Sequence, residues 1–269
     1  MRLGKPLLTL WAFLVYLFLF SPILMVVLMS FSTAKYSVFP IRAWTIEWYG
    51  RAFADEKIRS ALGTSVSIAI VASLIGTLIG TLGAMALVRY RFRMLAFTRA
   101  YFLAPLLIPE IITGIALLSM ATLLSVQSGV VLVVIGHVLF GLPFVVTVVS
   151  ARLYGFDRTL EEAAMDLGAD EMTTFRRITL PLLMPAVLGG LLLSFTISFD
   201  NFLITYLLAG SDVMTIPVHI YSMIRFEFTP KIHAISTVIV FASVSLILIS
   251  QLLTREQRGP ANEPAAGEG

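Results

Sequence analysis

Two carboxylates and an amide lie within long apolar stretches of the chain: Glu110, Asp200 and Asn201. Ionisable groups inside a membrane-crossing helix are costly, and by default they face the protein interior or a water-filled path. Oxygen-rich side chains of this kind could hold a cationic amine, so we expect the three residues to line a polar path. The alternative is that the carboxylates pair with other helices of this chain or of a partner.

Other chemistries have little support in the sequence. A phosphate-binding loop needs Gly-Lys followed by Ser or Thr, but the single Gly-Lys pair, Gly4-Lys5, is followed by Pro6. The chain has no cysteine, and its three histidines lack metal-ligand spacing. We expect His137 to form a hydrogen bond between helices. With no nucleophile–base set, the chain is predicted to be no enzyme by itself and to hold neither metal nor cofactor.

Composition predicts an integral membrane protein. Hydrophobic residues make up 58% of the 269 residues and charged residues 13%, about half the charged fraction of a soluble domain. The net charge of +3 would be compatible with binding to nucleic acid. However, the basic residues sit at the ends of apolar blocks, where they orient spans. We therefore expect contact with membrane lipids and none with nucleic acid.

The apolar blocks predict an all-α polytopic fold with six transmembrane helices. The uncharged stretch 111–151 is too long for one crossing, and the segment 125–129 offers a turn within it. The first block is longer than the apolar core of a signal peptide, so we expect it to be retained. The predicted spans form one transmembrane domain, 1–254, and are 7–29, 61–88, 100–124, 129–150, 186–208 and 232–253.

Two spans carry features of their own. Pro105 and Pro109 should break the helix of the third span, and a broken helix needs protein or a water-lined cavity around its free backbone groups. In the second span, small residues at every fourth position form a ridge that allows close helix approach: Ala72, Gly76, Gly80 and Ala84.

Basic residues predict the orientation of these spans. Six spans place both termini on one side, and twelve Lys and Arg residues on that side against seven on the other favour cytoplasmic termini. Segment 152–185 is then a cytoplasmic loop. Trp44, Trp48 and Tyr49 predict an interfacial segment at the outer face. The tail 255–269 is expected to be disordered.

The loop 152–185 contains a charged, helix-patterned segment. Thr159 and Glu162 have the spacing of a capping box, Gly168 is a natural helix stop, and Asp170 can cap a second short helix. One apolar stripe is expected on the first helix, from Leu160, Ala163, Ala164 and Leu167. The stripe could simply pack on the protein's own spans. A connection of more than 30 residues is more often functional.

Glu162-Ala163-Ala164, three residues, Gly168, nine residues and then Ile178-Thr-Leu-Pro181 resembles the EAA signature of bacterial ABC importer permeases. The resemblance covers roughly residues 7–253 and implies the type I ABC importer permease fold. In that family the loop contains a coupling helix that docks on a cytoplasmic ATPase. The resemblance therefore assigns ATPase coupling to Leu160, Glu162, Ala163, Ala164, Leu167 and Gly168.

Within the family, the chain is most similar to the second permease of spermidine/putrescine importers. The segments 105–114, 198–202 and 216–223 carry this closer likeness. It departs at Asn201, where the polyamine subgroup has a second acidic residue. Related permeases are similar to importers for opines, aminophosphonates, thiamine and ferric iron, and these solutes remain alternatives.

The resemblance also implies an assembly in a bacterial inner membrane. A homologous second permease would complete the pathway, with a different chain favoured over a second copy. Two ATPase subunits would supply ATP and Mg²⁺, and a solute-binding protein would deliver the small cationic solute. Glu110, Asp200 and Asn201 would line the translocation pathway. Two readings compete with it: a secondary transporter coupled to ions through Glu110 and Asp200, and a membrane scaffold that transports nothing.

Overall fold

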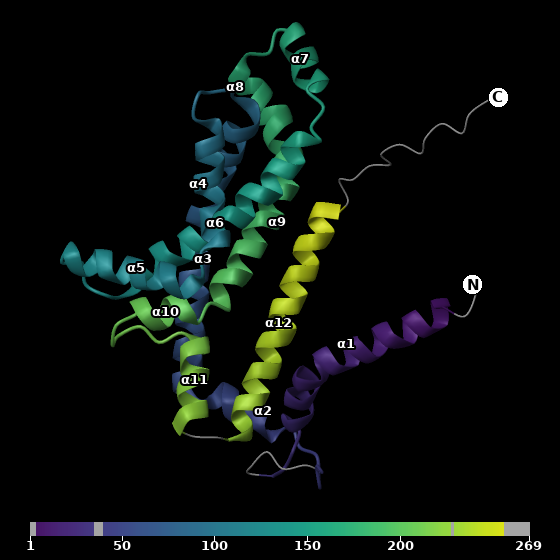
Figure 1. Ribbon diagram of the computed structural model, residues 1–269, viewed down its shortest axis with the longest axis vertical. Helices are drawn as coiled ribbons and strands as arrows, with labels where there is room; N and C mark the ends of the chain where they lie inside the picture. Colours follow the sequence, from purple (N-terminus) through teal and green to yellow (C-terminus); the bar gives the residue numbers. More distant parts are fainter. Residues whose placement is uncertain (1–3, 35–39, 227–228, 256–269) are drawn as a thin grey trace. The chain divides into compact units, whose positions relative to one another are not determined.

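The structure, a computed structural model, describes residues 4–34, 40–226 and 229–255. Within these residues it is helical, and its one β-type contact is an isolated bridge between Ser32 and Trp44 (Figure 1). Of the tail 255–269 that was expected to be disordered, Arg255 instead ends a helix, and residues 256–269 lie outside the described residues. The elements are α1 Gly4–Met29, α2 Glu47–Ala54, α3 Glu56–Arg89, α4 Leu95–Leu107, α5 Glu110–Leu123, α6 Val130–Tyr154, α7 Thr159–Asp166, α8 Glu171–Thr174, the π-helical turn η1 Phe175–Thr179, α9 Leu180–Phe199, α10 Leu203–Leu208, α11 Ile216–Phe226 and α12 Pro230–Arg255.

The chain divides into two compact units. Unit 1 comprises residues 1–62 and 216–242, and unit 2 comprises 63–215 and 243–269. Helices α3 and α12 each begin in unit 1 and end in unit 2. All residues predicted to have a function, from Glu110 to Asn201, belong to unit 2.

Five helical segments of the described residues are long and apolar enough to cross a membrane, and counting the bent pair α4 and α5 as one span gives up to six. The all-α membrane fold predicted from the sequence is therefore confirmed. The five segments are 7–29, 56–89, 130–154, 171–199 and 230–253.

The third span is broken, as predicted, but at one proline rather than two. Helices α4 and α5 meet at an angle of 107°. Pro105 lies inside α4 without ending it, whereas Pro109 stands immediately before α5. The residue before a proline is driven to extended backbone, and Ile108 has a ψ of 127°. Pro109 therefore accounts for the end of α4.

The fifth span also differs from its prediction. Residues 186–208 were expected to form one helix, but α9 ends at Phe199 and the chain resumes as α10 at Leu203. The side-chain oxygen of Asn201 accepts a hydrogen bond from the backbone N–H of Ile204 at 3.0 Å. This bond satisfies a free amide at the start of α10, as N-terminal capping does. The polar residues therefore support a break that hydropathy does not reveal.

The small-residue ridge of α3 allows another helix to approach closely, as predicted, and the structure shows that at Gly80 this helix is α6. A Cβ built at Gly80 would lie 2.8 Å from Val145, closer than real side chains approach. Ala72 and Ala84, on either side, are buried. The ridge thus allows the two helices to approach at a distance that a larger side chain would prevent.

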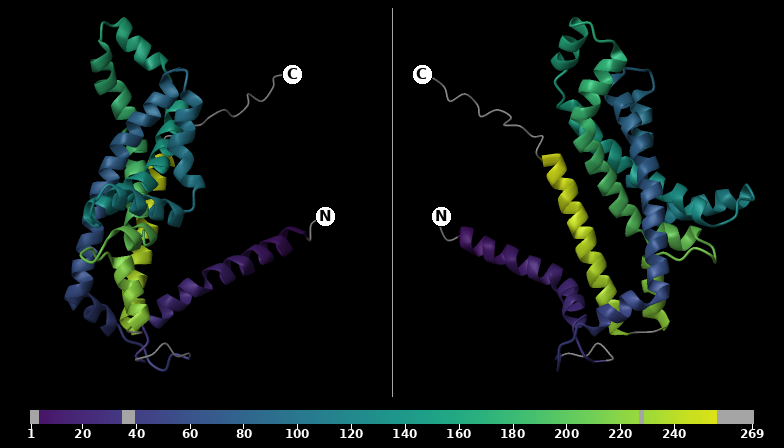
Figure 2. Two further views of the ribbon diagram at one scale, coloured as in Figure 1. Left: turned by 60° about the vertical axis from the view of Figure 1, so that its left-hand side comes forward. Right: turned by 180° about the vertical axis from the view of Figure 1, so that it is seen from behind.

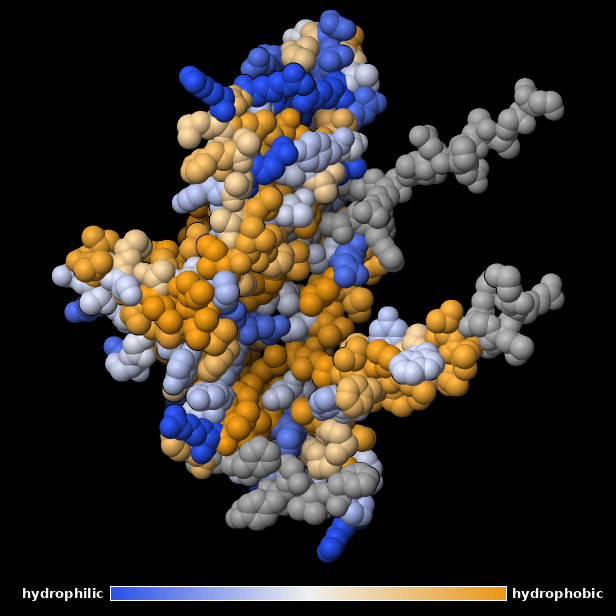
Figure 3. All heavy atoms as spheres, in the orientation of Figure 1, coloured by the Kyte–Doolittle hydropathy of each residue, from blue (hydrophilic) through white to orange (hydrophobic). Residues whose placement is uncertain are grey.

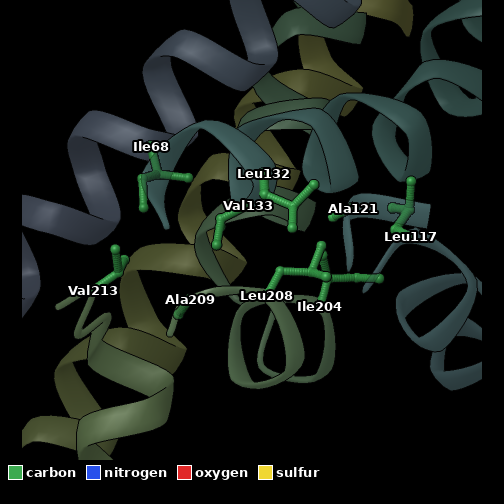
Figure 4. Close-up of a cluster of buried hydrophobic side chains, with 9 residues drawn as sticks. All are labelled: Ile68, Leu117, Ala121, Leu132, Val133, Ile204, Leu208, Ala209 and Val213. Atoms are coloured by element: carbon green, nitrogen blue, oxygen red, sulfur yellow. The ribbon is translucent and has the colours of Figure 1, made fainter. Parts of the chain in front are cut away.

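A buried apolar cluster fixes α5 and α10 against α3 and α6 (Figure 4). Ile204 and Leu208 of α10 are completely buried in it, and Gly136 of α6 offers the space that Ile204 occupies. The cluster consists of Ile68, Leu117, Ala121, Leu132, Val133, Ile204, Leu208, Ala209 and Val213. It holds both helices that follow a break, and so positions the polar residues at the breaks.

Candidate functional site

The two helix breaks of unit 2 meet through Glu110 and Asn201. Glu110 begins α5, and Asn201 lies between α9 and α10. The amide nitrogen Nδ2 of Asn201 donates a hydrogen bond to Oε1 of Glu110. Since its oxygen also accepts from Ile204, the orientation of this buried amide is determined at both ends. The structure thus brings two of the three predicted pathway residues into contact.

Asp200 is adjacent in sequence but bonds elsewhere. Its Oδ1 accepts a hydrogen bond of 2.9 Å from Oγ of Ser243 in α12. The side chain is exposed, unlike that of Asn201. Within the described part of the chain, neither Asp200 nor Glu110 forms an ion pair with a basic residue. Their contacts with other helices therefore leave both carboxyl groups without a basic partner among the described residues.

His137 supports the break between α9 and α10 from α6. Its Nδ1 lies 2.7 Å from Oγ of Ser198, and its Nε2 lies 2.9 Å from Oγ1 of Thr205. The predicted hydrogen bond between helices is confirmed. The sequence did not indicate that the two partners stand on opposite sides of one break, so that a single buried ring holds both flanks of Asn201.

Helix α7 lies with α8 at one end of unit 2, beyond α6 and α9 (Figures 1 and 2). Hydrophilic surface gathers at this end, whereas hydrophobic surface dominates the helices beside it (Figure 3). Leu160 and Leu167 are 48% and 91% exposed, yet Glu161 is only 9% exposed. The possibility that the apolar stripe packs on the protein's own spans is therefore wrong. The helix instead buries an acid, while Leu160 and Leu167, the residue that follows its last turn, are exposed.

The start of α7 differs from the predicted capping box. Asp157 accepts hydrogen bonds from the backbone N–H and the hydroxyl of Thr159, at 3.0 and 2.8 Å. These bonds lower the pKa of Asp157. Glu162 is exposed and takes no capping role. An aspartate two residues before Thr159 thus replaces the expected reciprocal pair.

The end of α7 follows the prediction. The helix ends at Asp166, and Gly168 has a φ of +91°, in the region that favours glycine. Its N–H donates to the carbonyl of Met165 at 2.9 Å. Two residues later Asp170 caps α8 by accepting from the backbone N–H of Thr173. Hydrogen bonding to the side chain and then to the backbone of Thr173 lowers the pKa of Asp170.

The second short helix of the loop is not separate. From Glu171 the chain continues through α8, η1 and α9 to Phe199, 29 residues in all, as one helical segment. Local pattern predicted a helix and then a return to the membrane at Pro181. However, proline fits the first turn of a helix without loss, so Pro181 begins α9 without interrupting the rod.

The structure adds three residues that the sequence did not single out. Arg89, the last residue of α3, donates from Nη2 to Oε1 of Glu161 at 2.6 Å. The hydroxyl of Thr179 donates to the same oxygen. The acids of the loop were visible in the sequence, but no pattern linked one of them to an arginine 72 residues away.

Comparisons with known proteins agree with this architecture. Residues 76–256 match the family described as "Binding-protein-dependent transport system inner membrane component". The chain is 36% identical to the spermidine/putrescine transport system permease protein PotC of Escherichia coli (strain K12), covering 90% of this chain and 92% of PotC. It is 38% identical to the putrescine transport system permease protein PotI of the same strain, covering 84% and 83%. A chain of a bacterial ABC transporter involved in the import of the acidic polysaccharide alginate has the same fold, with a TM-score of 0.67, 15% identity and coverage of 96% and 100%.

Proposed function

Because the chain belongs to the family of inner membrane components of binding-protein-dependent transport systems, we propose that it is a permease subunit of an ATP-driven importer for polyamines. It is a multi-pass protein of the bacterial inner membrane. The names of its relatives PotC and PotI support spermidine or putrescine as the solute. A second, homologous permease subunit would form the other half of the pathway.

The proposed coupling role rests on which side chains of the α7 region are buried and which are exposed. A helix on a water-facing loop normally turns its leucines inward and its acids outward. Here Leu160 and Leu167 are exposed and Glu161 is buried. Exposed apolar residues surrounded by polar ones are typical of a protein-binding surface. We infer that an ATPase subunit covers this face, since the chain has no phosphate-binding loop of its own.

The coupling residues of the proposal follow from this placement. Leu160 and Leu167 would enter a cleft of the ATPase, while Ala163 and Ala164 would allow close approach of the helix. Glu162 is exposed beside them, and Gly168 forms the turn that ends the helix. Two ATPase copies, one on each permease subunit, would hold ATP and Mg²⁺.

The charges at the helix breaks support a cationic solute. Glu110 and Asp200 bond to an amide and to a hydroxyl, and no basic side chain of the described residues neutralises them. A protonated amine passing between the subunits would gain favourable electrostatic interactions with both carboxylates. A solute-binding protein would deliver it from the outer side. The family membership counts against the ion-coupled secondary transporter.

Capture of the ATPase tests the proposal directly. Leu167→Glu should abolish co-purification of an ATPase from solubilised native membranes without unfolding the chain, because the 91% exposed side chain loses almost no internal contact. Leu124→Glu, at the exposed turn after α5, is the matched control and should retain it. The captured protein is identified by its phosphate-binding loop and its ATP hydrolysis.

Uptake by reconstituted vesicles completes the test. Labelled putrescine should accumulate only with the partner subunits, a solute-binding protein and ATP. Accumulation driven by a proton or sodium gradient without ATP would overturn the proposal in favour of a secondary transporter. Absence of any ATPase beside the wild-type chain, under conditions that preserve membrane complexes, would also overturn it.

A further inference from the structure

Glu161 is the one buried residue of α7. Its side chain is 12% exposed and that of its partner Arg89 is 22% exposed. Oε1 of Glu161 accepts hydrogen bonds from the guanidinium of Arg89 at 2.6 Å and from the hydroxyl of Thr179. A carboxylate with two donors in a shielded position forms a strong, charge-assisted contact.

The donors come from different membrane helices. Arg89 ends α3, and Thr179 lies in η1, one residue before α9. The guanidinium carbon of Arg89 also lies 5.7 Å from the ring centre of Phe156, in the link between α6 and α7, within the range of a cation–π contact. One carboxylate oxygen thereby connects α7 to α3 and α9, and Arg89 extends the connection to the chain that follows α6.

We propose that Glu161, Arg89 and Thr179 form a latch that transmits movements of α7 to the membrane helices α3 and α9. The inference rests on the proposed function, because it assumes that an ATPase moves α7. It concerns a different surface of the helix from the one that docks. The exposed leucines would receive the force, and the buried acid would pass it on. Glu161 is thus a positioning residue for coupling.

Helix α7 has few other contacts that could fix its position. The helix has eight residues and buries no apolar side chain of its own. An apolar contact is non-directional and permits sliding, whereas a charge-assisted hydrogen bond constrains distance and angle. Removing one member would leave a charge shielded from water without its partner, which is strongly unfavourable. The latch therefore holds the helix in one position while its apolar face remains free.

The ratio of solute imported to ATP hydrolysed tests the latch. Glu161→Gln keeps the shape and a hydrogen-bond acceptor but removes the negative charge opposite Arg89. In the reconstituted importer this variant should still capture the ATPase and hydrolyse ATP, while putrescine uptake per ATP falls at least tenfold. Asp166→Asn, an exposed acid on the same helix, is the matched control and should retain the wild-type ratio.

A double variant separates transmission from general damage. When Arg89→Gln is added to Glu161→Gln, the two neutral amides can form a hydrogen bond with each other. Putrescine uptake per ATP should therefore recover in part. An unchanged ratio in Glu161→Gln would overturn the latch while leaving the proposed function intact. Loss of ATPase capture in Glu161→Gln alone would also overturn it, because the pair would then only maintain the docking fold. If the wild type itself neither captures an ATPase nor uses ATP, the proposed function fails and the latch with it.

Discussion

Residue 201 is an amide where a carboxylate would be expected for a polyamine permease, and its contacts show what the amide contributes. Nδ2 donates a hydrogen bond to Glu110, and Oδ1 accepts one from the backbone N–H of Ile204 at the start of α10. A carboxylate at position 201 could still accept the hydrogen bond from Ile204, but it could not donate one to Glu110. Asn201 therefore holds Glu110 in place without adding a charge, and leaves Asp200 as the second carboxylate of the region.

Asn201→Asp should destabilise the protein, because two carboxylate oxygens would face each other where a hydrogen bond was. A buried polar group that loses its partner costs about 1–3 kcal/mol. Thermal unfolding in detergent should show the corresponding fall in melting temperature. Adding Glu110→Gln should restore most of it, since a glutamine amide can donate to the new carboxylate. A variant as stable as wild type would show that this contact contributes nothing.

At the level of elements, helix α3 needs a glycine at one position and has no need of one at another. Helix α3 presents the ridge from Ala72 to Ala84 to α6, yet Gly63, nearer its start, has no atom within 4 Å of where a Cβ would lie. Glycine costs helix stability wherever it is not required by close packing. The two glycines of α3 at positions 63 and 80 should therefore respond oppositely to the same substitution.

Gly80→Ala should lower the free energy of unfolding by about 1–3 kcal/mol, the usual cost of overpacking, because the new methyl would lie 2.8 Å from Val145. Gly63→Ala should raise it by about 0.5–1 kcal/mol through lost freedom of the unfolded chain. Thermal melts of the two purified variants beside wild type provide the measurement. Equal effects of both substitutions would contradict the packing of α3 on α6 described here.

Much of the fold could be predicted, because a membrane imposes simple rules on hydropathy. The apolar blocks, the turn at 125–129, the break before α5 and the stop at Gly168 follow from local residue types, whereas the fifth span differs from its predicted range. The break at Asn201 could not be predicted in this way. Helices α9 and α10 are both apolar, and the break between them depends on a hydrogen bond from Asn201 to the distant residue Glu110. Arg89 and Thr179 could not be predicted for the same reason, because their contacts with Glu161 join residues that are 72 and 18 positions apart.

At the level of the whole molecule, unit 1 contains an ion pair that makes its stability depend on pH. Lys231, near the start of α12, bonds to Asp55, which precedes α3. The hydrogen bond from Lys231, together with its positive charge, lowers the pKa of Asp55 from the ordinary value of 3.8. An acid whose pKa is lower in the folded state contributes stability above its unfolded pKa and loses it as pH falls.

Asp55→Asn should accordingly melt at a lower temperature than wild type at pH 6, by the equivalent of about 1 kcal/mol for a partly exposed pair. The gap should persist down to about pH 4 and close as the pH falls below 3.8, through the lowered pKa of Asp55. Melting curves of both proteins across this range would show it. A constant difference between Asp55→Asn and wild type at every pH would contradict this account.

The uninterrupted helix from Glu171 to Phe199 has a consequence for how such a permease can change over generations. At 1.5 Å per residue its 29 residues separate the two ends by about 40 Å. Thr179, which belongs to the proposed latch, lies in the first third of this helix, and Asp200 follows its last residue, about 30 Å away along the helix axis. Under the proposed roles, substitutions that change which solute passes therefore lie far from those that would disturb coupling to the ATPase. On this proposal, a related permease can acquire a different solute through a few replacements near Asp200 while its contacts with the ATPase stay unchanged.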